Sequence, residues 1–484
     1  MEQTTISPRT APWREELRKS HSAKERTEIP RVKMPELPAD YRARSLTEEV
    51  NQGLSQEQAV LEATRCLDCP DPQCVTGCPV GINIPGFIKN IERENFTDAL
   101  AVLRETSALP AVCGRVCPQE KQCESKCIYN KMKKPAVAIG YLERFAADTA
   151  TLPAPERPAP NGKKIAVVGS GPAGLSFAGD MAKKGYDVTV FEALHEIGGV
   201  LKYGIPEFRL PNAVVEREIK GLEAIGVHFE KDTVIGRTLS YDDLHAMGFD
   251  GIFVASGAGL PRFMNIPGEN LINVLSSNEY LTRVNLMHAG QPGYATPVFR
   301  GKRVAIIGGG NTAMDSCRTA LRMGAERSIV VYRRSEAEMP ARLEEVKHAK
   351  EEGVEFLTLH NPVEYLADEK GRVRAMRLQQ MELGEPDASG RRSPVAIPGA
   401  IVEVEVDMVI VSVGVSPNPL IPSSIDGLEV TSRGTIAADA ESLRSSLGDL
   451  YAGGDIVRGG ATVILAMGDG RRAAAAMHKA LCQE

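Results

Sequence analysis

Two stretches of the chain repeat the same order of apolar and amphipathic segments. The first begins at Lys164 with the apolar run IAVVG, continues through an amphipathic stretch to Lys184, and ends with DVTVFEA. The second begins at Arg303 with VAIIGGG, continues to Met323, and ends with SIVVYRR. Such apolar runs predict parallel strands buried on both faces, with helices between them. The first glycines of the two repeats lie 139 residues apart (308 against 169), which is too long for a solenoid and suits two nucleotide-binding domains.

The segments before the first repeat have weaker patterns. Residues 1–45 are charged and punctuated by prolines, which predicts an extended N-terminal arm. Ser55 and Gln58 have the spacing of a capping box, so a helix should begin there and lead to the first cysteines. The cysteine region is expected to be mostly helical, with a last helix over residues 139–147. Four prolines between residues 151 and 164 predict a stiff linker and a domain boundary.

Composition narrows the functional classes. The chain has 484 residues and a formal net charge of −6, with a pI near 5.9, so it lacks the strongly basic character of proteins that bind nucleic acids or anionic membranes. The N-terminal segment has charges and prolines where a secretory signal has an apolar core, and no apolar run approaches the roughly 18 residues of a membrane span. We therefore expect a cytoplasmic protein, in which clustered cysteines are metal ligands rather than disulfides.

The first repeat carries a dinucleotide-binding fingerprint. Gly169, Gly171 and Gly174 form G-x-G-x-x-G directly after a strand and at the start of a helix. Glycines there permit a tight turn, close approach of a pyrophosphate and close packing of the helix, whose N-terminus supplies N–H donors. Glu192 ends the second strand, 23 residues after Gly169, where a carboxylate accepts hydrogen bonds from ribose hydroxyls. Strand, helix and acid together predict a dinucleotide site rather than a structural glycine turn.

The second repeat carries a related fingerprint without the acid. Its residues at the turn from strand to helix are Gly308, Gly310, Asn311, Thr312 and Ala313. Arg333 and Arg334 occupy the end of the second strand, where the carboxylate would stand. A guanidinium can hold a 2′-phosphate with forked, charge-assisted hydrogen bonds, so we expect NADPH rather than NADH. The alternative is that the two arginines are a solvated basic strand end.

Eight of the ten cysteines form two quartets, which are Cys66, Cys69, Cys74, Cys78 and Cys113, Cys117, Cys123, Cys127. Their spacings are C-x2-C-x4-C-x3-C-P and C-x3-C-P-x4-C-x3-C. Cysteines followed by proline are typical of bacterial ferredoxins, in which the last ligand of a run crosses to the other cluster. Structural zinc is the alternative, but a redox-inert ion would carry no electrons beside two dinucleotide sites. We therefore favour iron–sulfur clusters. Cys317, Cys482 and His195 show no such pattern and are expected to be structural or surface residues.

The C-terminal segment 451–474 (YAGGDIVRGGATVILAMGDGRRAA) resembles the return motif of flavoproteins that have two dinucleotide domains. That resemblance implies that Asp455 binds the ribityl–pyrophosphate part of FAD. It also implies that Thr462 and Val463 face the pyrimidine end of the flavin ring, at a helix N-terminus that stabilises negative charge. The second dinucleotide domain is then an insertion in the first.

A glycine-rich loop over residues 196–210 should also wrap the flavin, through Gly199 and Gly204, unless it is an ordinary surface loop. The predicted domains are an arm over 1–45, a helical iron–sulfur domain over 46–155, an FAD-binding domain over 162–295 and 409–484, and an NADPH-binding domain over 299–408.

From about residue 50 to the end, the chain resembles the small subunit family of NADPH-dependent glutamate synthase. The matching segments include ATRCLDC, GCPVGINIPGFI, LPAVCGRVCPQEKQCESKC, VVGSGPAGL, IIGGGNTAMD and VYRRSEAEMP. The same module is found in dihydropyrimidine dehydrogenase, in NADH-dependent ferredoxin:NADP oxidoreductase and in sulfide dehydrogenase. The resemblance implies an α/β fold with two Rossmann-like domains, preceded by an α-helical domain that holds two 4Fe-4S clusters.

The resemblance also implies crossed ligation of the clusters. One would be bound by Cys66, Cys69, Cys74 and Cys127, and the other by Cys78, Cys117, Cys123 and Glu143. Cys113 would then bind no metal. Two alternatives stay open: eight cysteines suffice for two clusters if Cys113 is the last ligand, and Glu143 is in that case a solvated helix carboxylate beside Arg144.

The function that these residues imply is electron transfer from NADPH through FAD and two 4Fe-4S clusters to a partner protein. The favoured partner is the glutamate synthase large subunit, which would make the glutamate, because this chain shows no amidotransferase nucleophile at its terminus. The alternative is a ferredoxin:NADP oxidoreductase or sulfide dehydrogenase subunit with the same cofactors. A third hypothesis is a non-catalytic scaffold that binds zinc.

Overall fold

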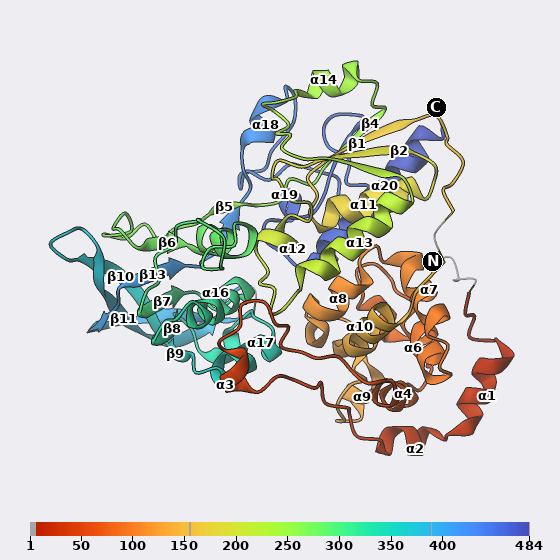
Figure 1. The fold of residues 1–484 in the computed structure, drawn as a ribbon, viewed down its shortest axis with the longest axis horizontal. Coiled ribbons are helices and arrows are strands. Elements are labelled where there is room, and N and C mark those ends of the chain that lie inside the picture. Colours follow the sequence, from red (N-terminus) through yellow and green to blue (C-terminus); the bar gives the residue numbers. More distant parts are fainter. Residues whose placement is uncertain (1–5, 154–155, 389, 484) are drawn as a thin grey trace.

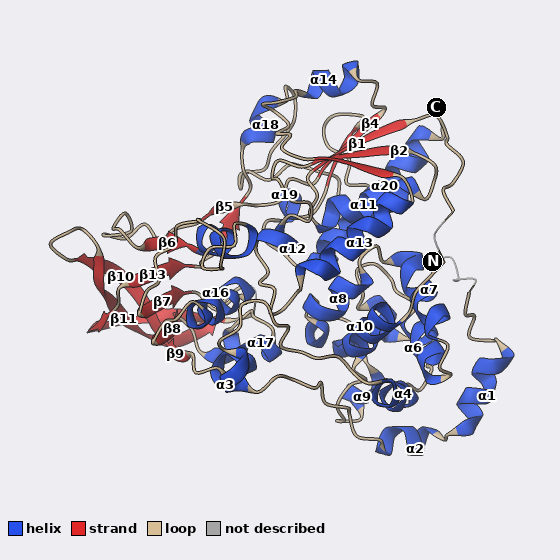
Figure 2. Ribbon diagram, viewed as in Figure 1, coloured by secondary structure: helices blue, strands red, loops and turns tan. Residues whose placement is uncertain are grey.

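The computed structural model describes residues 6–153, 156–388 and 390–483. They form an N-terminal helical part (residues 6–153) and two α/β units, each built on a parallel sheet (Figure 1). The first α/β unit comprises residues 156–261 and 415–483, and the second comprises residues 262–414. Figure 2 shows the strands confined to these two units, while the part with the cysteines is helical, as predicted. The predicted linker between residues 151 and 164 includes residues 154 and 155, which lie outside the described part.

The helical part consists of short helices joined by tight turns. They are α1 (Pro12–Ser20), α2 (Ala23–Glu28), α3 (Ala39–Arg42), α4 (Gln56–Thr64), α5 (Gln73–Thr76), α6 (Ile84–Glu92), α7 (Phe96–Thr106), α8 (Pro110–Val116), η1 (Gln119–Lys121), η2 (Glu124–Lys126), α9 (Ile128–Lys131) and α10 (Ile139–Thr149). The capping box is confirmed: the Ser55 hydroxyl accepts from Gln58 N and the Gln58 side chain accepts from Ser55 N. The last helix of this part, α10, is also found where predicted.

The arm lies against the rest of the protein through buried charges. Arg14 forms an ion pair with Asp68, and Arg26 Nη1 lies 2.8 Å from Glu92 Oε1. Farther along, Arg42 on α3 reaches the second α/β unit, where its Nε lies 3.0 Å from Glu352 Oε1. The arm thus follows the helical part and ends against the second unit, as the red trace in Figure 1 shows.

The first α/β unit has a five-stranded parallel sheet in the order β15-β4-β1-β2-β3. Its elements are β1 (Lys164–Val168), α11 (Pro172–Ala182), β2 (Asp187–Phe191), α12 (Val200–Tyr203), α13 (Asn212–Ala224), β3 (Val227–Glu230), α14 (Tyr241–Ala246), β4 (Gly251–Val254), β5 (Leu260–Pro261), β14 (Val415–Ser416), α18 (Leu420–Ser424), β15 (Leu450–Ala452), α19 (Asp455–Arg458) and α20 (Val463–Leu481). The central strands β1 and β4 are buried almost throughout, which explains their continuous apolar sequences.

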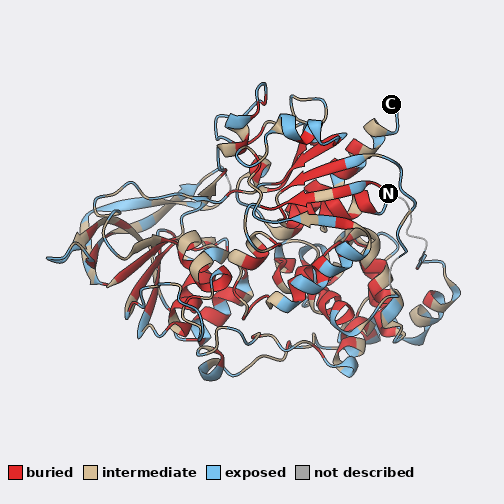
Figure 3. Ribbon diagram, turned by 45° about the horizontal axis from the view of Figure 1, so that its top comes forward, coloured by how far each residue is buried: buried red, intermediate tan, exposed pale blue. Residues whose placement is uncertain are grey.

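The second α/β unit repeats this plan with the sheet order β6-β13-β7-β8-β9. Its elements are β6 (Val274–Ser276), α15 (Ser277–Leu281), the π-helical turn η3 (Thr282–Leu286), β7 (Arg303–Ile307), α16 (Asn311–Arg322), β8 (Arg327–Tyr332), η4 (Glu336–Glu338), α17 (Leu343–Glu351), β9 (Glu355–Thr358) and β13 (Met408–Val411). A three-stranded antiparallel sheet covers one side and consists of β10 (His360–Ala367), β11 (Val373–Pro386) and β12 (Arg392–Glu405). Much of β12 is exposed (Figure 3).

Two strands lie in a different unit from the one that the sequence boundaries give them. β6 and β13 pair with each other, and β13 pairs with β7, so both belong to the second unit. The predicted boundaries at 295/299 and at 408/409 therefore fall inside this unit. The chain crosses between the units through β5 and β14, which pair antiparallel over two residues each. An apolar run predicts a strand but not the sheet that the strand joins, and β6 is only three residues long.

The helical part and the first α/β unit share one hydrophobic core, whereas the second unit has cores of its own. Helix α20 lies at the centre of the shared core. It packs so closely on α11 that a Cβ added at Gly470 would lie 2.3 Å from Ala173 O. One added at Gly468 would lie 3.0 Å from Pro79 O, next to the first cysteine quartet. Within the described chain, no helix combines the length and the hydrophobicity needed to cross a lipid bilayer.

Candidate functional site

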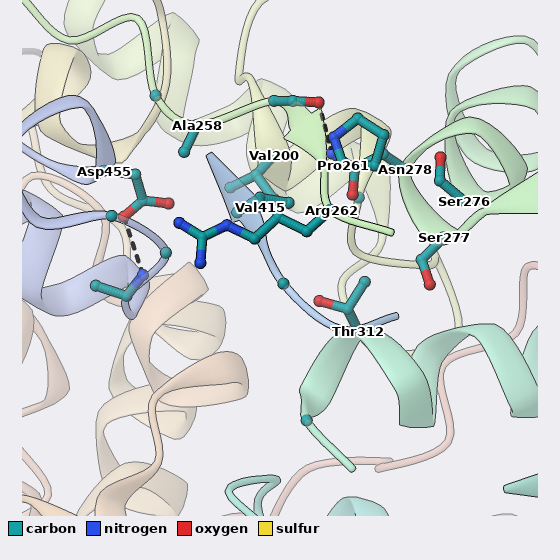
Figure 4. A pocket seen from close by; sticks show the side chains of 18 of the residues that line it. Val200, Ala258, Pro261, Arg262, Ser276, Ser277, Asn278, Thr312, Val415 and Asp455 are labelled. Carbon is teal, nitrogen blue, oxygen red and sulfur yellow. Dashed lines mark hydrogen bonds between the residues drawn. The ribbon is translucent and has the colours of Figure 1, made fainter. Parts of the chain in front are cut away.

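A cavity of about 1890 Å³ lies between the two α/β units, and residues of both glycine fingerprints line it. Sites for single small molecules commonly measure about 300–1,000 Å³. The cavity is thus large enough for two dinucleotides placed end to end. Figure 4 shows part of its wall, where Asp455 of the first unit and Thr312 of the second face the same space.

The glycines of the first fingerprint have distinct roles in this wall. Gly169 has φ +103°, in the region that favours glycine, and a Cβ there would lie 2.6 Å from Ala255 O. A Cβ at Gly174 would lie 2.0 Å from Gly169 O, so this glycine lets α11 pack on the strand. Gly171, the N-cap of α11, has open space where a Cβ would point. The turn thus leaves room beside helical N–H donors, which is what a pyrophosphate needs.

Glu192 is buried at the end of β2 and lines the cavity beside this turn. One of its carboxylate oxygens accepts a hydrogen bond from Ser170 N at 3.0 Å, and the other accepts one from Leu194 N at 2.9 Å. The side chain therefore ties the fingerprint turn to the neighbouring strand. The oxygen that accepts from Ser170 N also accepts from the Ser170 hydroxyl at 2.5 Å. The oxygen that accepts from Leu194 N can accept a further hydrogen bond, so the geometry is compatible with the ribose contact predicted for Glu192.

The segment after β15 forms the opposite wall. Asp455 Oδ1 accepts a hydrogen bond from Ala461 N at 3.1 Å (Figure 4), and burial raises the pKa of Asp455 to about 6. Thr462 is the N-cap of α20, so Thr462 and Val463 present a helix N-terminus to the cavity. Gly199 and Gly204 also line it. Gly199 has φ +56°, and a Cβ there would lie 2.9 Å from the Cα of Gly171 in the first fingerprint.

The second fingerprint lies across the cavity, at the start of α16. A Cβ at Gly308 would lie 2.3 Å from Ser412 O, and Gly310 is the N-cap of the helix. Asn311 and Thr312 line the cavity, whereas Ala313 is buried beneath its wall in the core of the second unit. The helix N-terminus again points its N–H groups toward the space where a phosphate would lie.

The two arginines at the end of β8 differ in their surroundings. Arg333 is exposed and lines the cavity, and the described structure records no ion pair for it. Arg334 also lines the cavity but is buried. Its Nη2 lies 2.7 Å from Asp387 Oδ2, and its Nε donates to Arg392 O at 2.8 Å. Arg333 is thus free to meet a ligand, and Arg334 mainly supports the wall.

The thiols of the two quartets gather in two groups that exchange members. Burial raises the pKa of Cys74, and three neighbouring thiols raise it further, those of Cys66, Cys127 and Cys69. Burial also raises the pKa of Cys123, and its other neighbours raise it further: Glu124, Cys78, Glu143 and Cys117. Cys127 of the second quartet therefore lies with the first group, and Cys78 of the first quartet lies with the second. This exchange is the arrangement that crossed ligation requires.

Glu143 and Cys113 both adjoin the second group. Glu143, on α10, is buried, and its Oε1 has no hydrogen-bond partner in the described structure. Burial, with a smaller contribution from Glu218, raises the pKa of Glu143 to about 8. An orphaned carboxylate oxygen is costly unless it has a ligand. Cys113 is also buried, and its Sγ contacts the Sδ of Met467 on α20 at 3.4 Å. A hydrogen bond with Cys117 of the second group, together with burial, raises the pKa of Cys113.

The spacing of the thiols argues against a mononuclear zinc site. Zinc bonds of about 2.3 Å in a tetrahedron place sulfur atoms about 3.8 Å apart. In the described chain, no three of the cysteine thiols lie within 4.8 Å of one another.

Comparison with known proteins identifies both parts of the chain. Residues 42–153 match the family described as dihydropyrimidine dehydrogenase domain II, 4Fe-4S cluster, and residues 163–476 match pyridine nucleotide-disulphide oxidoreductase. The chain belongs to the pyridine nucleotide-disulphide oxidoreductase family. The predictions of an oxidoreductase and of two Rossmann-like domains behind a 4Fe-4S domain are thereby confirmed.

The curated relatives confirm the resemblance found in the sequence. The glutamate synthase (NADPH) small chain of Azospirillum brasilense is 37% identical over 440 residues, covering 89% of this chain and 90% of that protein. The NADP(+)-dependent formate dehydrogenase subunit beta of Moorella thermoacetica is 38% identical over 438 residues, covering 85% of this chain and 60% of that protein. FprA of Mycobacterium tuberculosis in complex with NADPH has a TM-score of 0.56 at 21% identity, over 66% of this chain and 85% of that chain, and supports the fold alone.

Several residues of the cavity carry no motif that sequence reasoning could use. Arg262 directly follows β5 and Asn278 lies in α15, and Figure 4 shows Arg262 reaching into the cavity. Val116 and Pro118, on either side of a predicted cluster ligand, also line it. The second group of thiols, which includes Cys117, therefore lies next to the cavity of this oxidoreductase.

Proposed function

We propose that the chain transfers electrons from NADPH through FAD and two 4Fe-4S clusters to a partner protein. Its family makes it an NADPH-dependent FAD oxidoreductase. The observation that carries the full pathway is the position of α20. This helix begins in the wall of the cavity at Thr462 and then contacts Cys113 through Met467, beside the second group of thiols.

The first unit supplies the proposed FAD site, on one wall of the cavity. Its residues would be Gly169, Gly171, Gly174, Glu192, Gly199, Gly204, Asp455, Thr462 and Val463. A bound flavin accepts hydride and releases electrons singly, which is the chemistry that joins a nicotinamide to iron–sulfur clusters. The chain itself positions the two rings, excludes water and presents the α20 N-terminus, whose dipole favours negative charge at the pyrimidine end.

The second unit supplies the proposed NADPH site. The backbone at Gly308, Gly310, Asn311, Thr312 and Ala313 would hold the pyrophosphate, and Arg333 with Arg334 would hold the 2′-phosphate. Because both fingerprints open into one cavity, a nicotinamide in the second unit can face a flavin in the first.

The helical part would hold two clusters with crossed ligation. The outer cluster would use Cys66, Cys69, Cys74 and Cys127, and the cluster next to the cavity would use Cys78, Cys117, Cys123 and Glu143. The exchange of Cys78 and Cys127 between the groups supports this assignment, and the orphaned Glu143 oxygen supports the carboxylate ligand. Cys113 would remain a thiol in contact with Met467.

The favoured partner is the glutamate synthase large subunit, in the cytoplasm, because the relative from Azospirillum matches over nearly its whole length and is named as a small chain. The alternative is a different acceptor, as in ferredoxin:NADP oxidoreductase or sulfide dehydrogenase. It is supported by the formate dehydrogenase subunit beta, in which a related module belongs to another enzyme.

Anaerobic purification from the native cells tests the proposal. The protein should be brown, contain one flavin and about eight irons, lose its flavin absorbance on addition of NADPH, and bring the large subunit with it. Bleaching by NADPH with a different attached subunit would favour the alternative. Colourless protein with bound zinc would refute the electron pathway.

A further inference from the structure

A dipeptide of the first α/β unit, Phe208–Arg209, inserts into the second. Both residues lie in the loop between α12 and α13. The Phe208 ring is fully buried beneath two guanidinium groups of α16, at 4.8 Å from Arg318 and 3.8 Å from Arg322. Such stacking adds a cation–π attraction to apolar burial. The contact therefore joins the loop between α12 and α13 of the first unit to α16 of the second unit, whose sheets share no strand.

Arg209 completes this contact with buried charge. Its Nη1 donates to both carboxylate oxygens of Asp315 on α16, at 2.6 and 2.7 Å. Its Nε lies 3.0 Å from Glu345 Oε1 on α17. All three side chains are about nineteen-twentieths buried. Opening the contact would leave the Asp315 carboxylate and the Arg209 guanidinium without this ion pair, which is costly for buried groups, whereas Glu345 would keep its ion pair with Arg318.

The position of this contact allows it to restrict rotation of the second unit relative to the first. The covalent connection between the units is narrow, because β5 and β14 pair over only two residues each (Figure 1). The dipeptide contacts the second unit at a place other than that ribbon. Arg209 and Asp315 both line the cavity between the units. A two-residue ribbon leaves a unit free to turn unless a second attachment holds it. Other attachments exist. Asn285 Nδ2 donates to Tyr203 O at 3.3 Å. Arg342, at the N-cap of α17, donates to Arg115 O at 2.6 Å and to Gln119 Oε1 at 2.9 Å in the helical part.

We propose that Phe208 and Arg209 form a clasp that fixes the angle between the two units, and that Arg209 and Asp315 are positioning residues for hydride transfer. This inference rests on the proposed NADPH and FAD sites. Hydride transfer requires the reacting atoms to approach within roughly 3–3.5 Å, so a small rotation of the second unit lowers the rate at full occupancy. NADPH affinity should change little, because the fingerprint and the arginines of β8 move as one body.

The test compares Asp315→Asn and Arg209→Lys with Glu92→Gln in the full protein. Asn cannot accept two charge-assisted hydrogen bonds, and Lys keeps the charge but cannot bridge both carboxylates. Glu92 serves as the control because its buried ion pairs, with Arg26 and Lys89, lie entirely within the helical part. Two measurements are made: hydrogen exchange of α16 and of the β5–β14 ribbon, and stopped-flow bleaching of the flavin against NADPH concentration.

We expect faster exchange of these segments and at least a tenfold lower limiting rate in Asp315→Asn. Arg209→Lys should lie between this variant and the wild type. The apparent Kd for NADPH should stay within about threefold, and bleaching by dithionite should be unchanged. A limiting rate within twofold of the wild type, or equal losses in Glu92→Gln, would overturn the clasp. A wild type that NADPH does not bleach would instead overturn the proposed function, while the exchange data would still decide whether the clasp exists.

Discussion

Replacing Arg333 by Ala should convert an NADPH-selective protein into one that barely distinguishes NADPH from NADH. Arg333 is exposed, lines the cavity at the end of β8 and has no ion pair in the described structure. Its loss should therefore leave folding almost unchanged, because no buried partner is abandoned. What it removes is the proposed contact with the 2′-phosphate, which NADH lacks.

The magnitude follows from the type of contact. A hydrogen bond to a charged group contributes about 1.5–3 kcal/mol, and each 1.4 kcal/mol corresponds to about tenfold in affinity. Arg333→Ala should therefore raise the Kd for NADPH about 10- to 100-fold and change the Kd for NADH less than about threefold. Arg334→Ala should behave differently, because it also removes a buried pair with Asp387. We expect it to lower the unfolding temperature as well as the affinity for NADPH.

The assay is stopped-flow bleaching of the flavin with each nucleotide, at several concentrations and constant ionic strength. Arg327→Ala is the matched control, since Arg327 is an exposed arginine at the opposite end of the same strand, 2.7 Å from Glu355. It should leave both nucleotides unaffected. Equal losses for NADPH and NADH in Arg333→Ala, or no loss for either, would refute the assignment of the 2′-phosphate site.

Three further outcomes are expected. Glu143→Ala should retain about half of the iron of the wild type, whereas Cys113→Ser should retain nearly all of it, and iron analysis with the opposite result would exchange their roles. Gly174→Ala should prevent FAD binding and lower stability, because its Cβ would lie 2.0 Å from a backbone oxygen. Gly171→Ala has open space for its Cβ and should fold normally with weaker FAD binding. Thermal unfolding and flavin content measure both effects. Burial raises the pKa of Asp455 to about 6, and FAD needs the carboxylate form as acceptor. FAD affinity of the flavin-free protein should thus fall up to about tenfold per pH unit below pH 6, and a titration of Asp455→Asn should lack this dependence.

The sequence predicted the strands of both sheets where burial on two faces leaves an unbroken apolar run, as in β1 and β7. It predicted the fingerprint turns because their positive φ angles and close backbone contacts require glycine, and the spacing of these glycines is visible in the sequence. It placed β6 and β13 in the wrong unit, because pairing partners are chosen by tertiary packing and not by local composition. A three-residue strand such as β6 also carries too little pattern to detect.

The site was predictable to the same extent. Motif residues such as Glu192 and Asp455 do line the cavity, whereas Arg262 enters it from a connecting segment without any repeated pattern. The Phe208–Arg209 contact was likewise invisible, since its partners lie more than a hundred residues away on α16. Pairings of this kind depend on how two units meet, which no local periodicity encodes.

The distribution of cores shows which parts of this protein must keep a constant distance. The cysteine groups and the first unit share one core, and α20 joins them through contacts that exclude a side chain at Gly470 and leave little room for one at Gly468. A single core of this kind resists small displacements, because packed side chains shift only in discrete steps. The second unit has its own cores and is held by a short ribbon and by buried charge. In the proposed pathway, electron transfer from flavin to clusters would therefore run through the part with one shared core, whereas NADPH would bind to the unit that has cores of its own.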